Sequence, residues 1–271
     1  MTTTFTYTLG EVEPYINWIY FDYAWGMSGK AKEEREKLRS EACRLLADLS
    51  HDYHTHAALG LFETNADGDD IVIGDTRLPM LRQQHPVEQR DTPNLCLADF
   101  IRPAATGIAD RIGIFATTVD YAMERLHLHD DYLRMLTQTL ADRLAEATAE
   151  KLHEDVRKHI WGYAPDEQLT MDELHREAFQ GIRPAVGYPS MPDTSMNFLL
   201  SGLIDMKGIG IRLTESGAMR PHASVSGLMI AHPKARYFVL GKIGEDQLRD
   251  YAGRRGLPVE LARRFLAGNL E

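Results

Sequence analysis

The sequence predicts an α+β fold, in which antiparallel strands pair with one another and helices gather in separate groups. Hydrophobic residues recur at helical spacing through 30–49 and much of 120–161. Strand candidates follow one another directly at 209–217, 223–232 and 235–243, without helices between them. Consecutive strands beside grouped helices are typical of α+β proteins, and of neither βαβ repeats nor all-α bundles.

The N-terminal third predicts one aromatic segment, one helix and two strands. Residues 14–26, PYINWIYFDYAWG, are rich in aromatic side chains and are expected to be buried. Residues 30–49 predict a helix with leucines and alanines on one face and charged residues on the other. The segment 60–75, GLFETNADGDDIVIGD, predicts two short strands joined by a turn at 65–68, because Asn, Asp and Gly favour chain reversal.

The middle of the chain predicts a strand followed by helices. Residues 110–119, DRIGIFATTV, read as a buried strand. The helical pattern over 120–161 is expected to break near 127–131 and so to form two helices. Thr170-Met-Asp-Glu173 is a capping box, which predicts the start of another helix that runs to Phe179.

A loop, GIRPAVGYPS, follows from Gly181 to Ser190, and its prolines restrict the backbone. A short helix is expected at 194–206, and the last two strand candidates are expected to form a hairpin at 232–234. Two terminal helices should follow, the first ending at Gly256. The second should have Pro258 near its first turn and Gly268 past its end.

Composition excludes several classes of protein. The chain has 271 residues and a formal net charge of −10, which argues against a nucleic acid as the main partner. Two cysteines provide neither a disulfide framework nor a zinc site. With no signal peptide and no apolar run near the roughly 18 residues of a membrane span, we expect no membrane association and a cytoplasmic protein.

Arg183, in the loop, is the first candidate for ligand binding. A guanidinium matches a carboxylate or phosphate with two parallel hydrogen bonds, and Pro184 and Pro189 reduce the entropy lost when a ligand is held. Gly187 permits a positive φ or a close ligand approach. The alternative is a structural turn in which Arg183 pairs with a nearby acid.

Glu146 and Glu177 lie on predicted helices and would suit a cationic ligand, although both could be ordinary exposed glutamates. Tyr237 and Phe238 are adjacent on a predicted strand, so one should face inward and one outward. Either ring could stack on a ligand or pack in the core.

Two histidine clusters contain side chains that can bind metals. One holds His51, His54 and His56, and the other holds His127 and His129. Neither has a recognised metal-ligand spacing, so we expect solvated loops and no metal site. No phosphate-binding glycine motif and no nucleophile motif is present.

Several motifs nevertheless resemble one known family. The stretch ADRLAEATAEKLHEDVRKHIWGYAPDEQLTMDELHREAFQGIRPAVGYP is similar to the C-terminal activation domain of cobalamin-dependent methionine synthase. The segments YINW, GLFETNADGDDI, CLADFI, LTESGAM, ASVSG and HPKARYF are also similar, in the family's order. The resemblance runs from about residue 11 to 269 and implies one domain over 1–271, with an N-terminal lead-in at 1–28 and an α+β body at 29–271.

The resemblance implies a helmet-shaped α+β fold with a twisted antiparallel sheet and a groove for S-adenosylmethionine. Domains of this family dock over a corrinoid when its cobalamin has been oxidised to cob(II)alamin. An electron from reduced flavodoxin and the methyl group of S-adenosylmethionine then restore methylcobalamin.

By this resemblance, Arg183 corresponds to the arginine that binds the ligand carboxylate. Ala185 and Tyr188 correspond to contacts of the adenosine end, and Glu146 and Glu177 to glutamates that approach the ligand.

Other site positions match in part or differ. Tyr237 matches one of a pair of tyrosines, whereas Phe238 replaces the second. Asn17 stands where the family has an aspartate that contacts the ligand. Further differences lie at Arg220, His222 and Ser190-Met191.

The resemblance begins within a dozen residues of Met1, so we expect a free-standing chain with no homocysteine, folate or cobalamin module. The cobalamin would then be held by a separate corrinoid protein or by a methionine synthase that lacks this module. The chain would be a component of a methyltransferase activity, without a catalytic side chain of its own. The alternative is a diverged, non-catalytic binding module with the same fold and another ligand.

Overall fold

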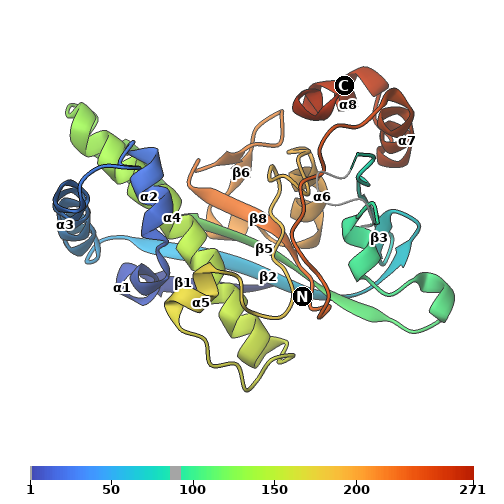
Figure 1. Ribbon diagram of the computed structural model, residues 1–271, viewed down its shortest axis with the longest axis horizontal. Helices are drawn as coiled ribbons and strands as arrows, with labels where there is room; N and C mark the ends of the chain where they lie inside the picture. The colour runs from blue at the N-terminus through green and yellow to red at the C-terminus, as the bar shows by residue number, and fades with distance from the viewer. Residues whose placement is uncertain (1, 86–92) are drawn as a thin grey trace.

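Figure 1 shows the computed structural model of the protein, which describes residues 2–85 and 93–271. A six-stranded antiparallel sheet runs through its centre in the order β4-β3-β2-β5-β8, with β1 pairing along the first half of β2. The strands are β1 (Thr2–Thr8), β2 (His54–Asp67), β3 (Asp70–Ile73), β4 (Thr76–Pro79), β5 (Asp110–Val119) and β8 (Ser224–Met229). A separate two-stranded ribbon joins β6 (Arg212–Leu213) and β7 (Met219–Arg220).

Helices cover this sheet and gather at both ends of the molecule (Figure 1). The α-helices are α1 (Leu9–Val12), α2 (Trp18–Ala24), α3 (Lys32–Leu49), α4 (Asp131–Asp155), α5 (Met171–His175), α6 (Met196–Leu203), α7 (Glu245–Arg255) and α8 (Val259–Phe265). Short 3₁₀ helices are η1 (Glu13–Tyr15), η2 (Leu97–Phe100), η3 (Ala104–Thr106), η4 (Tyr121–Arg125), η6 (Lys207–Ile209) and η7 (Ala267–Asn269), and a π-helical turn, η5 (Val156–Ile160), extends α4.

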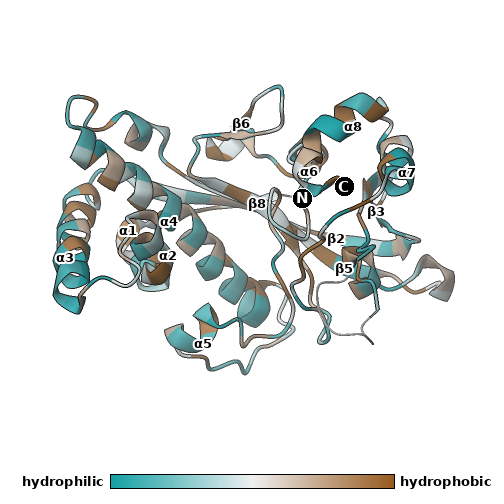
Figure 2. Cartoon of the chain, turned by 45° about the horizontal axis from the view of Figure 1, so that its top comes forward, coloured by the Kyte–Doolittle hydropathy of each residue, from teal (hydrophilic) through white to brown (hydrophobic). Residues whose placement is uncertain are grey.

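The sheet is the middle layer between two hydrophobic cores, because its side chains alternate between faces. Ala57, Leu59 and Phe115 face the core that α4 and the N-terminal helices complete. Ala58 and Ile114 face the opposite core, beneath α6. Figure 2 shows hydrophilic and hydrophobic residues interspersed along the helices, as expected where one face is buried and the other meets water.

Helix α4 is the element that positions the site. It lies against β5, β2 and β8 and presents Leu140, Leu144 and Ala145 to the core. The hydroxyl of Thr117 on β5 donates to the carbonyl of Ala145 over 2.9 Å, a buried link between helix and sheet. Among the residues that the structure describes, no helix is long and apolar enough to cross a membrane.

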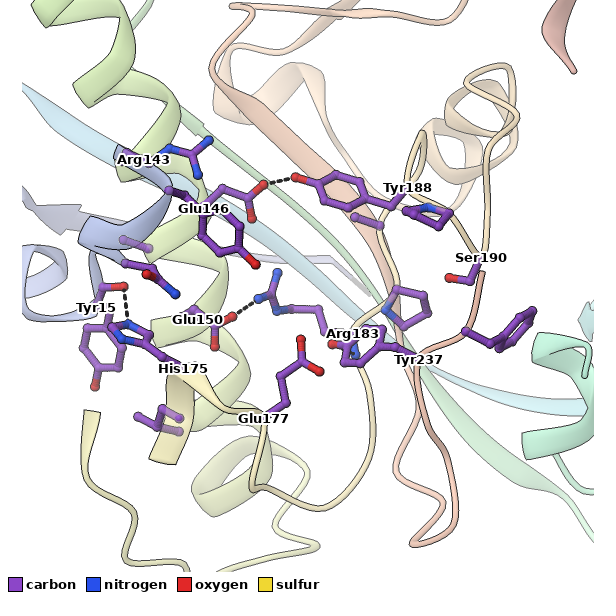
Figure 3. A pocket seen from close by; sticks show the side chains of 18 of the residues that line it. Tyr15, Arg143, Glu146, Glu150, His175, Glu177, Arg183, Tyr188, Ser190 and Tyr237 are labelled. Carbon is purple, nitrogen blue, oxygen red and sulfur yellow. Dashed lines mark hydrogen bonds and ion pairs between the residues drawn. The ribbon is translucent and has the colours of Figure 1, made fainter. Parts of the chain in front are cut away.

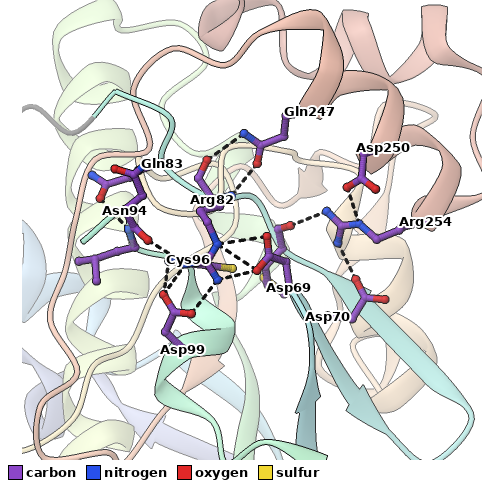
Figure 4. A network of polar contacts seen from close by, with 12 residues as sticks. Asp69, Asp70, Arg82, Gln83, Asn94, Cys96, Asp99, Gln247, Asp250 and Arg254 are labelled. Carbon is purple, nitrogen blue, oxygen red and sulfur yellow. Dashed lines mark hydrogen bonds and ion pairs between the residues drawn. The ribbon is translucent and has the colours of Figure 1, made fainter.

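Polar contacts hold the C-terminal helices against the β3–β4 hairpin (Figure 4). The Arg82 guanidinium lies between Asp69 and Asp99, with Nη2 2.5 Å and 2.7 Å from their carboxylates. Arg254 on α7 joins Asp70, 2.5 Å away, to Asp250. The Arg254–Asp70 pair thus ties α7 directly to strand β3.

Several sequence predictions are confirmed. The antiparallel α+β architecture is present, and the strand at 110–119 has the expected bounds. The helical pattern breaks between η4 and α4, although the first piece is a 3₁₀ helix. The Thr170 capping box is formed, and Gly256 ends α7 in the left-handed region with φ 65°.

Other predictions are wrong at their boundaries. Segment 14–26 is only partly buried, because Ile19, Tyr20 and Tyr23 of α2 are exposed. Strand β2 begins at His54 and continues through Asp67, so the turn between β2 and β3 lies at 68–69, later than the predicted 65–68.

The later helices and ribbon also differ from expectation. The helix after Thr170 ends at His175 instead of Phe179. The last helix does have Pro258 at its start and Gly268 past its end, because α8 stops at Phe265 and Gly268 falls in the separate turn η7. Of the strand predicted at 209–217, only the two residues of β6 form a strand. Gly210 adopts a left-handed φ of 90°, which is not compatible with a strand there.

The predicted strand at 235–243 and its hairpin at 232–234 are absent; this described segment is irregular. The edge of β8 is already occupied by the 181–190 loop, through bridges from Ile182 to Ile230 and from Ala185 to Gly227. The chain after β8 therefore has no free edge there and passes over the loop instead.

Gly227 allows this close approach and provides a test of it. A Cβ atom at this position would lie 2.1 Å from the carbonyl oxygen of Pro184 and 2.9 Å from the Cα of Ala185. We expect Gly227→Ala to lower the free energy of unfolding by about 1–3 kcal/mol, because the loop must shift away from the strand. Urea denaturation followed by circular dichroism measures this.

The control is Gly202→Ala in α6, where a Cβ atom would meet nothing within 4 Å. Alanine is the better helix former, so this variant should match the parent protein or gain up to about 1 kcal/mol. Equal denaturation midpoints for the two variants would contradict the close-approach explanation.

Candidate functional site

A pocket of about 580 Å³ opens between α4, the 181–190 loop, the end of α5 and the segment 237–239. Figure 3 shows these elements contributing side chains that converge on one space. The volume lies within the range of about 300–1,000 Å³ that small-molecule sites occupy in proteins. The pocket is therefore large enough for a ligand of nucleotide size.

All eight residues that the sequence selected line this pocket. They come from five separate stretches of the chain, and the fold brings them together. They are Asn17, Glu146, Glu177, Arg183, Ala185, Tyr188, Tyr237 and Phe238.

The loop is held as an irregular extra strand along β8. The amide of Leu228 donates to Pro184 over 3.0 Å, and the amide of Val186 donates to Ser226 over 2.9 Å. Gly187, with φ 87°, turns the chain back so that its amide reaches Met191 over 2.8 Å. Backbone hydrogen bonds therefore fix the positions of Arg183 and Tyr188.

Arg183 is the buried cation of the site. Its side chain is 8% exposed, and its backbone amide donates to the phenol oxygen of Tyr237 over 2.8 Å. Its guanidinium donates through Nη2 to Glu150 of α4 (Figure 3). Burial tends to lower the pKa of Arg183, but Glu150 outweighs this and raises the pKa above its ordinary value. The side chain therefore stays charged.

The contact to Glu150 realises the alternative that the sequence left open, namely that Arg183 pairs with an internal acid. Sequence reasoning did not select Glu150. Its position four residues after Glu146 was the available signal, because helical residues at that spacing lie on the same face.

Glu177 reaches the pocket through an unusual helix ending. After α5, the amide of Ala178 donates to Glu173 over 3.0 Å, and the amide of Glu177 donates to Leu174 over 2.9 Å. These two bonds form a Schellman motif, in which the residue at Glu177 is usually glycine. Glu177 has φ 59°, in the left-handed region that costs non-glycine residues energy.

The carboxylate of Glu177 consequently lies beside Arg183 at the exposed rim (Figure 3). Partial burial and then repulsion by Glu150 raise its pKa above the ordinary 4.5, although Arg183 opposes the shift. The surroundings therefore favour the ionised form of Glu177 less than water does.

Two tyrosines supply hydroxyl groups to the pocket. Tyr188 donates its phenol hydrogen to Glu146, and burial followed by Glu146 raises the pKa of Tyr188. Burial also raises the pKa of Tyr237 to about 12, against the opposing influence of Arg183. Both phenols therefore remain protonated at neutral pH.

Asn17 and Phe238 complete the walls. The side-chain oxygen of Asn17 accepts from the amide of Ile19 over 3.1 Å and caps α2, so its position is set by the helix start. The expectation that Tyr237 and Phe238 face opposite ways along a strand is wrong, because their segment is irregular and both line the pocket.

The histidine clusters lie elsewhere. His56 contacts Asp120 over 2.9 Å and the hydroxyl of Thr6 over 3.2 Å, which links strands β1, β2 and the end of β5. Within residues 2–85 and 93–271, no group of three or more His, Cys, Asp or Glu side chains is arranged to hold a metal ion.

Two comparisons with known proteins agree with this architecture. The family model described as "Vitamin B12 dependent methionine synthase, activation domain" matches residues 8–256. A crystal structure of the MetH reactivation domain bound to AdoHcy is 39% identical to this chain and superposes with a TM-score of 0.93. That match covers 100% of this chain and 90% of the other.

The left-handed Glu177 leads to a prediction about stability. We expect Glu177→Gly to raise the free energy of unfolding at pH 7 by about 1 kcal/mol, because glycine removes the backbone strain. Loss of the carboxylate adds to this gain only above pH 4.5, since a raised folded-state pKa destabilises the fold as the group ionises. Urea midpoints at pH 7 and pH 4 measure both contributions.

The matched control is Ala178→Gly, one residue further along, where φ is not positive. Glycine there relieves no strain and should leave stability unchanged or reduce it by up to about 1 kcal/mol. A destabilised Glu177→Gly protein would show that the residue serves the fold rather than the pocket.

Proposed function

This chain belongs to the family of vitamin B12-dependent methionine synthase activation domains, and on that premise we propose that its pocket binds S-adenosylmethionine for reductive methylation of cob(II)alamin. The cobalamin would be held by a separate corrinoid protein or methionine synthase. One observation carries the proposal: a relative that binds AdoHcy matches this chain over its whole length, and the residues selected for the ligand line one pocket.

The residues present fit such a ligand. S-adenosylmethionine combines an amino-acid head, a positive sulfonium and an adenosine, and the pocket offers groups for each. Arg183 can donate to the carboxylate, because its side chain lines the pocket and its guanidinium bond to Glu150 uses only Nη2. Glu146 and Glu177 balance positive charge, and Asn17 also lines the pocket.

The adenosine end would lie against the loop. The backbone of Ala185 and the ring of Tyr188 form one wall, and Tyr237 and Phe238 form another. Aromatic side chains provide flat apolar area together with hydroxyl groups, which suits a nucleoside. The loop is already fixed by its bonds to β8, so little entropy is lost when a ligand binds.

When bound, S-adenosylmethionine would supply the methyl group to the partner's cobalamin, once a reductant such as flavodoxin had provided one electron, and S-adenosylhomocysteine would be the leaving group. The chain's own residues hold and orient the donor, which is a contribution of position rather than of proton transfer. We assign no general acid or base.

Calorimetry tests the binding step. We expect saturable binding of S-adenosylmethionine and S-adenosylhomocysteine to the parent protein. Arg183→Gln should weaken both by about 10–100-fold, the worth of a charge-assisted hydrogen bond. The control Arg212→Gln changes an exposed arginine of β6 outside the pocket and should bind like the parent. No binding up to millimolar ligand would favour a diverged module with another ligand.

Reconstitution tests the methylation step. We expect the absorbance of methylcobalamin to appear when the chain, S-adenosylmethionine and a reductant are mixed with a cob(II)alamin-loaded methionine synthase that lacks its activation module. Omission of any component, or the use of Arg183→Gln, should slow its appearance. Normal ligand binding without methylcobalamin would reject the methylation role and leave the binding role intact.

A further inference from the structure

We propose that Glu150 selects ligands with a zwitterionic amino-acid head, by pairing with Arg183 in the ligand-free pocket and with the ligand's ammonium once its carboxylate takes Arg183. This inference rests on the proposed function, because it concerns the same pocket. It assigns a specificity role to a residue that the sequence did not single out.

The ion pair between these residues is incomplete. One oxygen of Glu150 contacts Nη2 of Arg183, whereas the other oxygen, Oε2, is buried without a hydrogen-bond partner in the part of the chain that the structure describes. Nε of Arg183 is buried and unpaired in the same way. Arginine and a carboxylate commonly form two parallel bonds, and buried polar groups are seldom left without partners. Both side chains therefore retain capacity for a further partner.

Both side chains also lie in the pocket wall, where a ligand can reach them. Arg183 is 8% exposed and Glu150 21% exposed, and Figure 3 shows them meeting at its centre. The neighbouring acids are placed differently. Glu146 accepts from Tyr188, and Glu177 lies at the rim. Glu150 is thus the acid whose charge a ligand must replace in order to reach Arg183.

Charge balance then decides which ligand can enter. A ligand with only a carboxylate would displace Glu150 and leave that anion buried without a cation. A ligand with only an ammonium would take Glu150 and leave Arg183 unpaired. Removing one partner from a buried ion pair is strongly unfavourable, because the other charge stays buried without compensation. A zwitterion avoids both costs, because it supplies one opposite charge to each member of the pair.

The arrangement of an α-amino acid matches this exchange. Its ammonium and carboxylate are attached to one carbon, so they lie side by side, as the charges of Arg183 and Glu150 do. Glu177, beside Arg183, provides a second anion toward the ammonium. The ligand's ammonium and carboxylate would then join Arg183 and Glu150 in a set of alternating charges, and each charged group would have an opposite neighbour.

Three ligands separate the contributions in a calorimetric test of Glu150→Gln. S-adenosylhomocysteine carries the zwitterion, its deaminated analogue carries only the carboxylate, and 5′-methylthioadenosine carries neither. We expect the variant to lose about tenfold or more in affinity for S-adenosylhomocysteine. The affinity of the variant for 5′-methylthioadenosine should stay within about twofold of the parent's. The variant should bind the deaminated analogue more tightly than the parent does, because Arg183 is no longer paired with Glu150.

The opposite signs for the zwitterion and the lone carboxylate are the result that a merely structural Glu150 would not produce. Equal losses for all three ligands, an unchanged affinity for S-adenosylhomocysteine, or weaker binding of the deaminated analogue would each overturn the inference. Glu150→Asp keeps the charge and should restore much of the preference. Glu260→Gln, at an exposed acid of α8 whose side chain is 84% accessible, is the control.

The same titrations distinguish this inference from the proposed function. If the parent protein binds neither S-adenosylhomocysteine nor 5′-methylthioadenosine, the proposed function fails and the role of Glu150 fails with it. If the parent binds both and Glu150→Gln leaves their ratio unchanged, only the role of Glu150 is rejected.

Discussion

The close contact between the 181–190 loop and strand β8 is the constraint on which the pocket depends. Gly227 has no side chain, so the carbonyl of Pro184 can approach β8 and accept from Leu228 over 3.0 Å. The loop then occupies the edge of the sheet, and the chain after β8 must cross over it. That crossing brings the Tyr237 hydroxyl within 2.8 Å of the Arg183 amide. One backbone contact therefore places two walls of the site.

The charges of the pocket are poorly balanced for a protein that serves only its own stability. Three glutamates, Glu146, Glu150 and Glu177, line the same space as two arginines, Arg143 and Arg183. One of these glutamates occupies a backbone conformation that favours glycine, and another leaves a buried oxygen unpaired within the described residues. Folded proteins retain such features mainly where function requires them. A ligand that carries both positive and negative groups would supply the missing partners.

Local signals in the sequence were sufficient for much of the framework. The strand at 110–119, the Thr170 capping box and the Gly256 cap all depend on residues within a turn or two of one another. The prediction of a strand at 235–243 was wrong because a strand also depends on residues far away in the sequence. The composition of this segment suits a strand, but a strand requires a free partner edge, and residues 182–185 had taken that edge.

The sequence by itself determined the α+β class through its hydrophobic spacing, and its motifs indicated the family and, through that resemblance, eight of the residues that line the pocket. Only the tertiary structure decided which of those residues pair with one another and with Glu150. Arg183 and Glu150 are 33 positions apart, and their contact exists because α4 packs against the sheet at one rotation and the loop lies on β8. Contacts of this kind follow from packing in three dimensions, and no spacing along the chain specifies them.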